Sequence, residues 1–252
     1  MTDATQGRDV VFTALFGRYE RLNEQPVAHV SNARFVCFTD VPELASESWE
    51  IRVVDPLLPG DPSRSSRFVK ALAYREFGHS RSLYIDNSVQ LKNEPSSLLD
   101  SWLADQPIAM MAHETRQTVS DEITACLRFG VDAPSRLREQ RTYYRQFLPE
   151  ALAMRPFWGG MIARRPDAGL EQLMKVWFAH ILRFSRRDQI SLPAASLQTG
   201  VAIRKVFGLN SESEWHDWPV VTGRSHGQRI VTARGQVRRL AGDQWRRLRT
   251  KR

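Results

Sequence analysis

Apolar residues in the first third of the chain fall into short, continuous runs that end at polar or turn-forming residues. The runs at 10–16, 34–39, 51–54 and 82–85 are rich in β-branched and aromatic residues, as in strands that are buried on both faces of a sheet. Residues 65–77 instead place apolar side chains at helical spacing beside basic ones. This order of strands around one helix predicts an α/β sheet.

The remaining pattern adds helices and two more strands. Helical spacing predicts helices at 94–103, 119–129, 135–147 and 169–184, and apolar runs predict strands at 108–112 and 161–164. Trp158-Gly159-Gly160 precedes the last of these strands, either with the indole beside exposed backbone or as a buried aromatic residue before a tight turn. We expect a disordered N-terminus at 1–8, one domain over 9–222, and a separate segment at 223–252.

Composition and the positions of the cysteines mainly exclude classes of protein. The chain has 252 residues, 42% hydrophobic and 25% charged, which is ordinary for a globular domain of this length. Cys37 and Cys126 lie far apart and form no CxxC pair, so we expect buried thiols in a reducing compartment. Because no secretory leader or run of 18 apolar residues is recognisable, the predicted location is cytoplasmic.

Net charge is concentrated in the last 30 residues. Segment 223–252 holds ten basic residues and one acid, a net charge of +9, whereas the other 222 residues carry a net charge of −1. Nucleic acid is therefore an unlikely partner of the folded domain, since such a domain spreads basic residues over a folded face. Leu240, Trp245 and Leu248 allow a short basic amphipathic helix over 237–248, and we expect this loosely ordered tail to bind the inner, anionic membrane surface peripherally.

Candidate chemistry lies at the ends of the predicted strands. The chain has no Walker loop, GxGxxG, GxSxG or HExxH motif, so the common nucleotide-binding, hydrolase and protease signatures are absent. Asp40 and Asp86 each follow a predicted strand, and Asp188 follows the last predicted helix. In an open α/β sheet, ligands bind beyond the carboxyl ends of the strands, so these acids are candidates for contact with a ligand.

Six short motifs occur in an order typical of one family. They are Phe12-Thr-Ala-Leu-Phe-Gly-Arg-Tyr19, Cys37-Phe-Thr-Asp40, Arg64-Ser-Ser-Arg67 with Lys70, Tyr84-Ile-Asp-Asn87, His113-Glu-Thr-Arg116 and Arg186-Arg-Asp-Gln-Ile-Ser191. Over residues 9 to 200 the chain resembles the glycosyltransferase-like family of plants and bacteria catalogued as domain of unknown function 616, which is named after turgor-regulation and mucilage-related proteins. The resemblance implies a GT-A-like, Rossmann-like fold with a mixed, mostly parallel sheet flanked by helices.

The resemblance also implies a reaction and its residues. The implied activity is transfer of a sugar from a nucleotide diphosphate-sugar donor to a hydroxyl of a glycan or lipid-linked acceptor, with Mn²⁺ or Mg²⁺ as cofactor. Asp86 is the implied metal ligand, although Ser88 stands where a second carboxylate is usual, and Asp188 or His216 is a candidate for the missing ligand. The other implied roles are donor binding by Thr13, Asp40, Arg64, Arg67, Lys70 and Arg116, acceptor binding by Trp158, Gly159 and Gly160, and catalysis by Asp188, Gln189 and His113.

Structural roles are open for the same residues. Asp40 and Asp86 are also readable as turn or cap residues at strand ends, and Asp188 as a helix N-cap. Arg64, Arg67 and Lys70 are also readable as a solvated basic face. Glu122 is an alternative carboxylate near His113. The alternative function is a catalytically weak protein of the same fold that binds carbohydrate or nucleotide.

Overall fold

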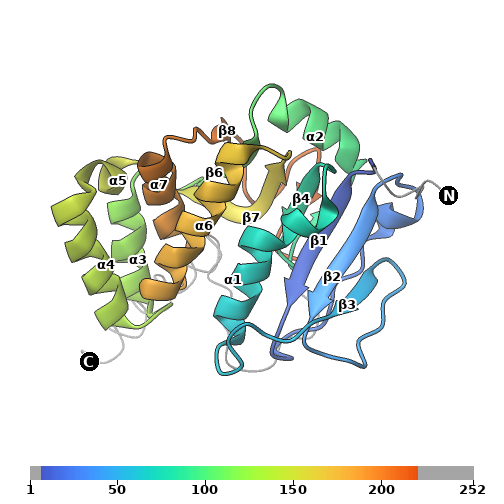
Figure 1. Cartoon of the computed structure of the whole chain (residues 1–252), viewed down its shortest axis with the longest axis horizontal. Coiled ribbons are helices and arrows are strands. Elements are labelled where there is room, and N and C mark those ends of the chain that lie inside the picture. The colour runs from blue at the N-terminus through green and yellow to red at the C-terminus, as the bar shows by residue number, and fades with distance from the viewer. Residues whose placement is uncertain (1–6, 221–252) are drawn as a thin grey trace, which may run out of the picture.

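The computed structural model describes residues 7–220. The predictions for residues 1–6, for the basic tail at 223–252 and for the helix at 237–248 lie outside the described residues. One seven-stranded sheet organises the chain, in the order β3-β2-β1-β4-β7-β6-β8 (Figure 1). Its strands are β1 (Val10–Leu15), β2 (Arg34–Thr39), β3 (Glu50–Val53), β4 (Ser82–Ile85), β6 (Ile108–Ala112), β7 (Phe157–Arg164) and β8 (Arg204–Val206).

The sheet is mixed and mostly parallel. β1 pairs in parallel with β2 and β4, β2 with β3, and β6 with β8. Only β7 runs antiparallel to its neighbours β4 and β6 in this sheet. A separate pair is formed by β5 (Gln90–Leu91) and β9 (His216–Asp217). The expected fold class, a mixed and mostly parallel sheet flanked by helices, is confirmed.

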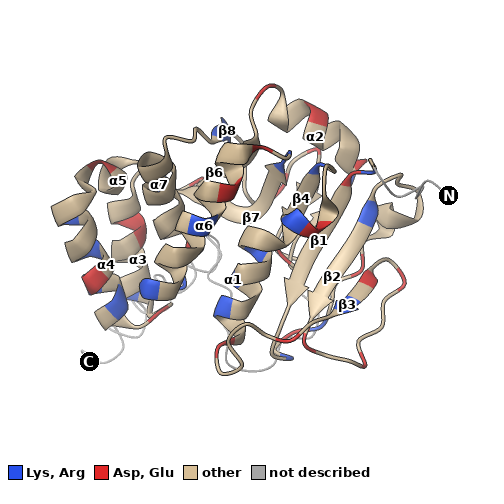
Figure 2. Ribbon diagram, viewed as in Figure 1, with Lys and Arg blue, Asp and Glu red and all other residues tan. Residues whose placement is uncertain are grey.

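Helices cover both faces of the sheet because the central strands are apolar on both sides. All six residues of β1 are buried and none is charged, while charged residues gather on the helices and edges (Figure 2). Helices α1 (Pro62–Leu72) and α6 (Ala168–Arg183) pack on one face together with the 3₁₀ turn η2 (Ala73–Phe77). Helix α2 (Pro95–Leu103) covers the other face, near the 3₁₀ turn η1 (Pro26–His29).

Besides the apolar cores on the two faces of the sheet, a third apolar cluster lies beside the sheet. It joins α3 (Val119–Phe129), α4 (Pro134–Phe147), α5 (Pro149–Ala153) and α7 (Asp188–Thr199). In Figure 1 these helices form a group on the far side of α6 from β1 and β2. Helix α3 begins with a capping box in which the Thr118 side chain accepts from the Asp121 backbone and the Asp121 side chain accepts from the Thr118 backbone. This cap fixes the first turn of α3, which faces the pocket described below.

The structure corrects one sequence-based prediction and adds one helix. Trp158, Gly159 and Gly160 lie inside β7 and form no turn before it. Residues 188–199, which the sequence pattern does not predict as helical, form α7 despite Pro193 within it. Within residues 7–220, no helix has the length and apolar character needed to cross a membrane.

Candidate active site

A pocket of about 540 Å³ opens where several elements end at the same edge of the sheet. Asp86 directly follows β4 and His113 directly follows β6, while the antiparallel β7 contributes residues from its beginning. Helices α1, α3 and α7 supply the opposite wall. This volume is in the usual range for small-molecule sites, and its place beyond the strand ends matches where α/β proteins bind ligands.

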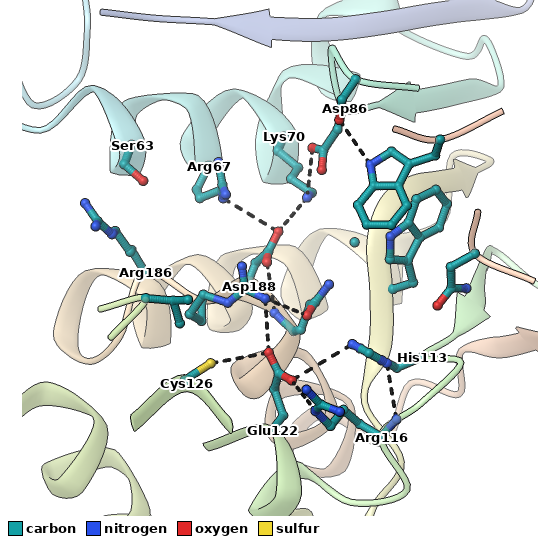
Figure 3. Close-up of a pocket in the computed structure, with 18 of the residues that line it drawn as sticks. Ser63, Arg67, Lys70, Asp86, His113, Arg116, Glu122, Cys126, Arg186 and Asp188 are labelled. Carbon is teal, nitrogen blue, oxygen red and sulfur yellow. Dashed lines mark hydrogen bonds and ion pairs between the residues drawn. The ribbon is translucent and has the colours of Figure 1, made fainter. Parts of the chain in front are cut away.

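A buried lysine lies between two carboxylates at the centre of this pocket (Figure 3). The Lys70 ammonium is 2.5 Å from Asp188 Oδ2 and 3.3 Å from Asp86 Oδ1. Its side chain is only 1% exposed, and the ammonium lies 5.0 Å from the centre of the Tyr84 ring. The Tyr84 hydroxyl donates to Asp86 Oδ1 at 2.8 Å. These contacts join α1 to the end of β4 and to α7, and Lys70 and Asp188 are 118 residues apart in the sequence.

Asp188 is held as an anion by its neighbours. Burial alone would raise the pKa of this carboxyl, but Lys70 and Arg67 lower it well below its ordinary value. Arg67 contributes through its Nε, which lies 3.6 Å from Asp188 Oδ2. A carboxylate with so low a pKa is a poor proton acceptor. Of the two roles open to Asp188, accepting hydrogen bonds from sugar hydroxyls therefore suits it better than acting as a base on the acceptor hydroxyl.

A second charged cluster surrounds Glu122 on α3. Its buried carboxylate accepts from Arg187 Nη2 at 3.0 Å and lies 3.3 Å from Arg116 Nε. Cys126 Sγ is 3.3 Å away and His113 Nε2 is 3.9 Å away. Burial would raise the pKa of Glu122, but the charge of Arg187 holds it below its ordinary value. Figure 3 shows Asp188 between this cluster and the side chains of α1.

His113 is neutral at physiological pH in this arrangement. Burial lowers its pKa to about 4, against the opposing effect of Glu122. Its Nδ1 accepts from the backbone N–H groups of Thr115 and Arg116, both at 3.3 Å. The ring proton of the neutral form is therefore on Nε2, the nitrogen nearest Glu122. His113 can donate a hydrogen bond from this atom, whereas removal of a proton from an acceptor would require the other tautomer.

The lowered pKa of His113 predicts a pH-dependent loss of stability. The unfolded chain takes up a proton near pH 6.5 and the folded chain only near pH 4, so stability present at pH 7 is lost as the pH falls through this window. Between pH 7 and pH 5 this histidine should cost about 2 kcal/mol of the free energy of unfolding. Urea unfolding of wild type and of His113→Asn, which keeps an acceptor for the two N–H groups, measures the difference. Equal pH dependence in the two proteins would contradict the assignment.

The start of β7 forms an aromatic wall of the pocket. Trp158 packs against the Trp218 ring at 5.3 Å between centroids and stacks on His216 at 5.2 Å. The Trp218 indole N–H donates to Ser88 Oγ at 3.1 Å. A Cβ atom on Gly160 would approach the Trp158 ring to 2.2 Å, so glycine is required there for the indole to take this position. Trp158 and Gly159 line the pocket, as the acceptor-binding prediction requires, whereas Gly160 does not.

Three predicted donor-binding residues lie outside the pocket lining. Arg64 is buried against α6, where it donates to the carbonyls of Ile181 and Phe184 at 2.8 and 2.7 Å. The Asp40 carboxylate accepts from the backbone N–H of Gly17 at 3.0 Å, and Thr13 is fully buried in β1. These residues support the fold around the pocket. The residues that the pocket does bring together are Arg67, Lys70, Asp86, His113, Arg116, Trp158, Gly159, Asp188 and Gln189.

Several lining residues carry no signal in the sequence. Arg187 stands in the sequence only as the neighbour of Asp188, yet it donates to both Glu122 and Gln189. Asn210 holds the loop after β6 because its Oδ1 accepts from the Glu114 backbone at 2.8 Å. Their partners are distant in the sequence, so no local pattern reveals them. For the aromatic wall, the sequence offers a signal in the two tryptophans of Trp215-His-Asp-Trp218, of which Trp218 lines the pocket.

The side chains around Asp86 fit a cluster centred on an ammonium group, and the predicted divalent cation does not fit them. Asp86 Oδ1 already accepts from Lys70 and Tyr84, and Ser88 Oγ accepts from Trp218. His216, a candidate second ligand, is fully buried and contacts Ser213 Oγ and the Asn210 carbonyl. Asp188, the other candidate, is paired with Lys70. Within residues 7–220, no group of three His, Cys, Asp or Glu side chains is placed to hold a metal ion.

The solved structures that are similar to this chain include the following two. Mouse xyloside xylosyltransferase 1 is a solved structure with a TM-score of 0.44 and 10% sequence identity, over 79% of this chain and 84% of that chain. The bifunctional glycosyltransferase WbbM gives a TM-score of 0.41 and 10% identity, over 80% of this chain and 39% of that chain.

Sequence comparison is more specific. The chain is 28% identical over 153 residues to the protein named "Probable hexosyltransferase MUCI70" of Arabidopsis thaliana, a match that spans 57% of this chain and only 26% of that relative. Residues 2–211 match the family described as TOD1/MUCI70, glycosyltransferase-like domain. This match covers most of the chain and all of the described pocket up to Asn210, so the chain belongs to the TOD1/MUCI70 glycosyltransferase-like family.

Proposed function

We propose that this protein transfers a sugar from a nucleotide diphosphate-sugar to an acceptor hydroxyl. The observation that supports this proposal is the charge arrangement of the pocket, where cations from helix α1 and from two loops surround three buried or half-buried carboxylates. The cations that contact these carboxylates are Arg67, Lys70, Arg116 and Arg187. Phosphate groups favour such fixed cations, while ionised carboxylates accept hydrogen bonds from sugar hydroxyls.

The two halves of the pocket suit the two parts of such a donor. Arg67 and Lys70 project from α1 at the end of the sheet where β1 and β4 lie side by side. Asp188 and Gln189 lie next to them at the start of α7, where they are suited to the sugar. The aromatic wall of Trp158 and Trp218 offers apolar faces for an acceptor. We therefore assign the diphosphate to the α1 side, the transferred sugar to Asp188, and the acceptor to the wall near His113.

A thermal-shift screen with nucleotide diphosphate-sugars tests this function. A true donor at about 100 times its Kd should raise the Tm by roughly 5 °C or more, because it binds only the native state. Arg67→Ala should reduce the shift, whereas the matched variant Arg75→Ala should keep it, since Arg75 is half-exposed, pairs with Glu171 and does not line the pocket. Mass spectrometry of glycan acceptors incubated with the donor then detects transfer.

The screen also separates the proposed enzyme from the alternative binding protein. Stabilisation by a donor without added mass on any acceptor would favour a carbohydrate- or nucleotide-binding module of the same fold. No stabilisation by any nucleotide diphosphate-sugar would contradict both assignments. The glycan or lipid-linked acceptor stays a prediction from the resemblance. Attachment of segment 223–252 to an anionic membrane stays a prediction from the sequence charge.

A further inference from the structure

The position of Lys70 is unusual because this ammonium is almost completely buried and has two acidic partners. Its ammonium contacts Asp188 and Asp86 at 2.5 and 3.3 Å while its side chain is 1% exposed. An ammonium group has three N–H donors. Two of them serve the carboxylates, which leaves one for a ligand in the pocket that Lys70 lines.

The surrounding backbone is shaped to keep this cation in place. Gly159 of β7 passes so close that a Cβ atom would lie 2.9 Å from Lys70 Nζ and 3.0 Å from Asp188 Oδ2. The Tyr84 ring lies on another side, 5.0 Å from the ammonium. A charge fixed in this way needs no reorganisation when negative charge develops next to it.

The same contacts leave little room for a divalent cation. A metal that joined Asp86 to Asp188 would have to take the place of the ammonium or lie next to it, where two positive charges repel each other. The residue two positions after Asp86 is Ser88, whose hydroxyl accepts from Trp218 and adds no carboxylate. Magnesium and manganese sites usually combine carboxylates with substrate phosphates, and here the carboxylates already have a resident cation.

We propose that Lys70, fixed between Asp86 and Asp188, supplies the positive charge that receives the departing diphosphate, so that donor binding needs no divalent cation. This inference rests on the proposed function. In the transfer, the bond from the anomeric carbon to the diphosphate oxygen breaks, and its electron pair stays on the diphosphate. The acceptor oxygen forms the new bond to that carbon, and the hydroxyl proton passes to the departing diphosphate. Lys70 and Arg67 face the oxygen on which the negative charge grows.

Calorimetry with nucleoside diphosphates tests the proposal on the full chain. UDP, GDP, ADP and CDP are titrated in buffer with EDTA and in buffer with Mn²⁺, and Mn²⁺ is also titrated alone. We expect at least one diphosphate to bind with a Kd that changes less than about threefold between the two buffers. Such a change in binding free energy is smaller than the net contribution of one typical hydrogen bond. Mn²⁺ alone should give no saturable heat.

Substitutions of Lys70 provide the second readout. Lys70→Met should weaken the diphosphate by about tenfold or more and leave the corresponding nucleoside unchanged, because only the diphosphate meets the ammonium. The matched control is Lys92→Met, whose lysine pairs with Asp217 outside the pocket. Combining Lys70→Met with Ser88→Asp should make diphosphate binding respond to Mn²⁺. Circular dichroism verifies that each variant folds. The comparison of EDTA and Mn²⁺ buffers on wild type tests the proposal even if a variant does not fold.

The outcomes distinguish this inference from the proposed function. Diphosphate binding that EDTA abolishes and Mn²⁺ restores would overturn the role of Lys70 and leave the donor assignment intact. Equal affinity of wild type and folded Lys70→Met for the diphosphate would overturn it as well. Failure of all four diphosphates in both buffers would instead overturn the donor assignment, and this inference with it.

Discussion

Replacing Asp188 with asparagine should lower the free energy of unfolding by about 2–4 kcal/mol and slow sugar transfer by about a hundredfold or more. The substitution keeps the shape of the side chain but removes the charge that pairs with Lys70 at 2.5 Å. Lys70 is then left with the more distant Asp86 in a place without water. Urea unfolding measures the first effect, and transfer from the donor found in the screen measures the second.

Two further variants separate stability from catalysis. Asp217→Asn removes a carboxylate from an exposed ion pair with Lys92 at 3.4 Å, and it should change stability by less than about 0.5 kcal/mol. The double variant Lys70→Met with Asp188→Leu replaces the buried pair with apolar side chains and should recover much of the lost stability. It should remain inactive. If Asp188→Asn unfolds and transfers sugar like wild type, the ion pair between Lys70 and Asp188 contributes neither to stability nor to catalysis.

The sequence predicts the strands well because their environment leaves a strong pattern. The continuous apolar runs at β1, β2, β4 and β6 reflect burial on both faces of a parallel sheet. The position of β7 between β4 and β6, antiparallel to both, leaves no such pattern. Pairing partners and strand direction depend on how the helices pack, and hydrophobic spacing does not record this.

Glycines mislead when they are interpreted from local sequence alone. Gly159 and Gly160 resemble a turn, yet they lie in the buried strand β7. The reason is distant in the sequence, since the space that a side chain would take at Gly159 is filled by Lys70 and Asp188. A strand glycine that marks the close approach of other groups is known from many sheets, but its partners appear only in three dimensions.

The basic residues of α1 show what helical spacing can predict about the pocket and what it cannot. Residues six apart on a helix differ by roughly 120° around its axis, so Arg64 and Lys70 cannot face one ligand together. Arg64 accordingly turns to the end of α6 and donates to the Ile181 carbonyl, while Arg67 and Lys70 turn to the pocket. The spacing therefore separates Arg64 from Lys70, whereas Arg67 lies roughly 60° from each of them. The packing of α6 decides that Arg67 faces the pocket with Lys70.

Gly159→Ala should be the most damaging single-methyl change at the pocket. The new Cβ atom would lie 2.9 Å from Lys70 Nζ and 3.0 Å from Asp188 Oδ2. Both side chains are buried and cannot swing into solvent, so the pair must separate or β7 must shift. We expect a loss of about 2–3 kcal/mol in the free energy of unfolding, measured by urea unfolding, together with weaker binding of the nucleoside diphosphate.

The matched control for this change is Gly60→Ala, because nothing lies within 4 Å of the Cβ position there, and it should stay within about 0.5 kcal/mol of wild type. A double-mutant cycle then identifies the atoms that clash. In a Lys70→Ala background the ammonium is gone, so the added methyl should cost at least about 1 kcal/mol less than in wild type. If the cost is the same in both backgrounds, the strain lies in β7 itself, and the close approach of Gly159 to Lys70 does not stabilise the pocket.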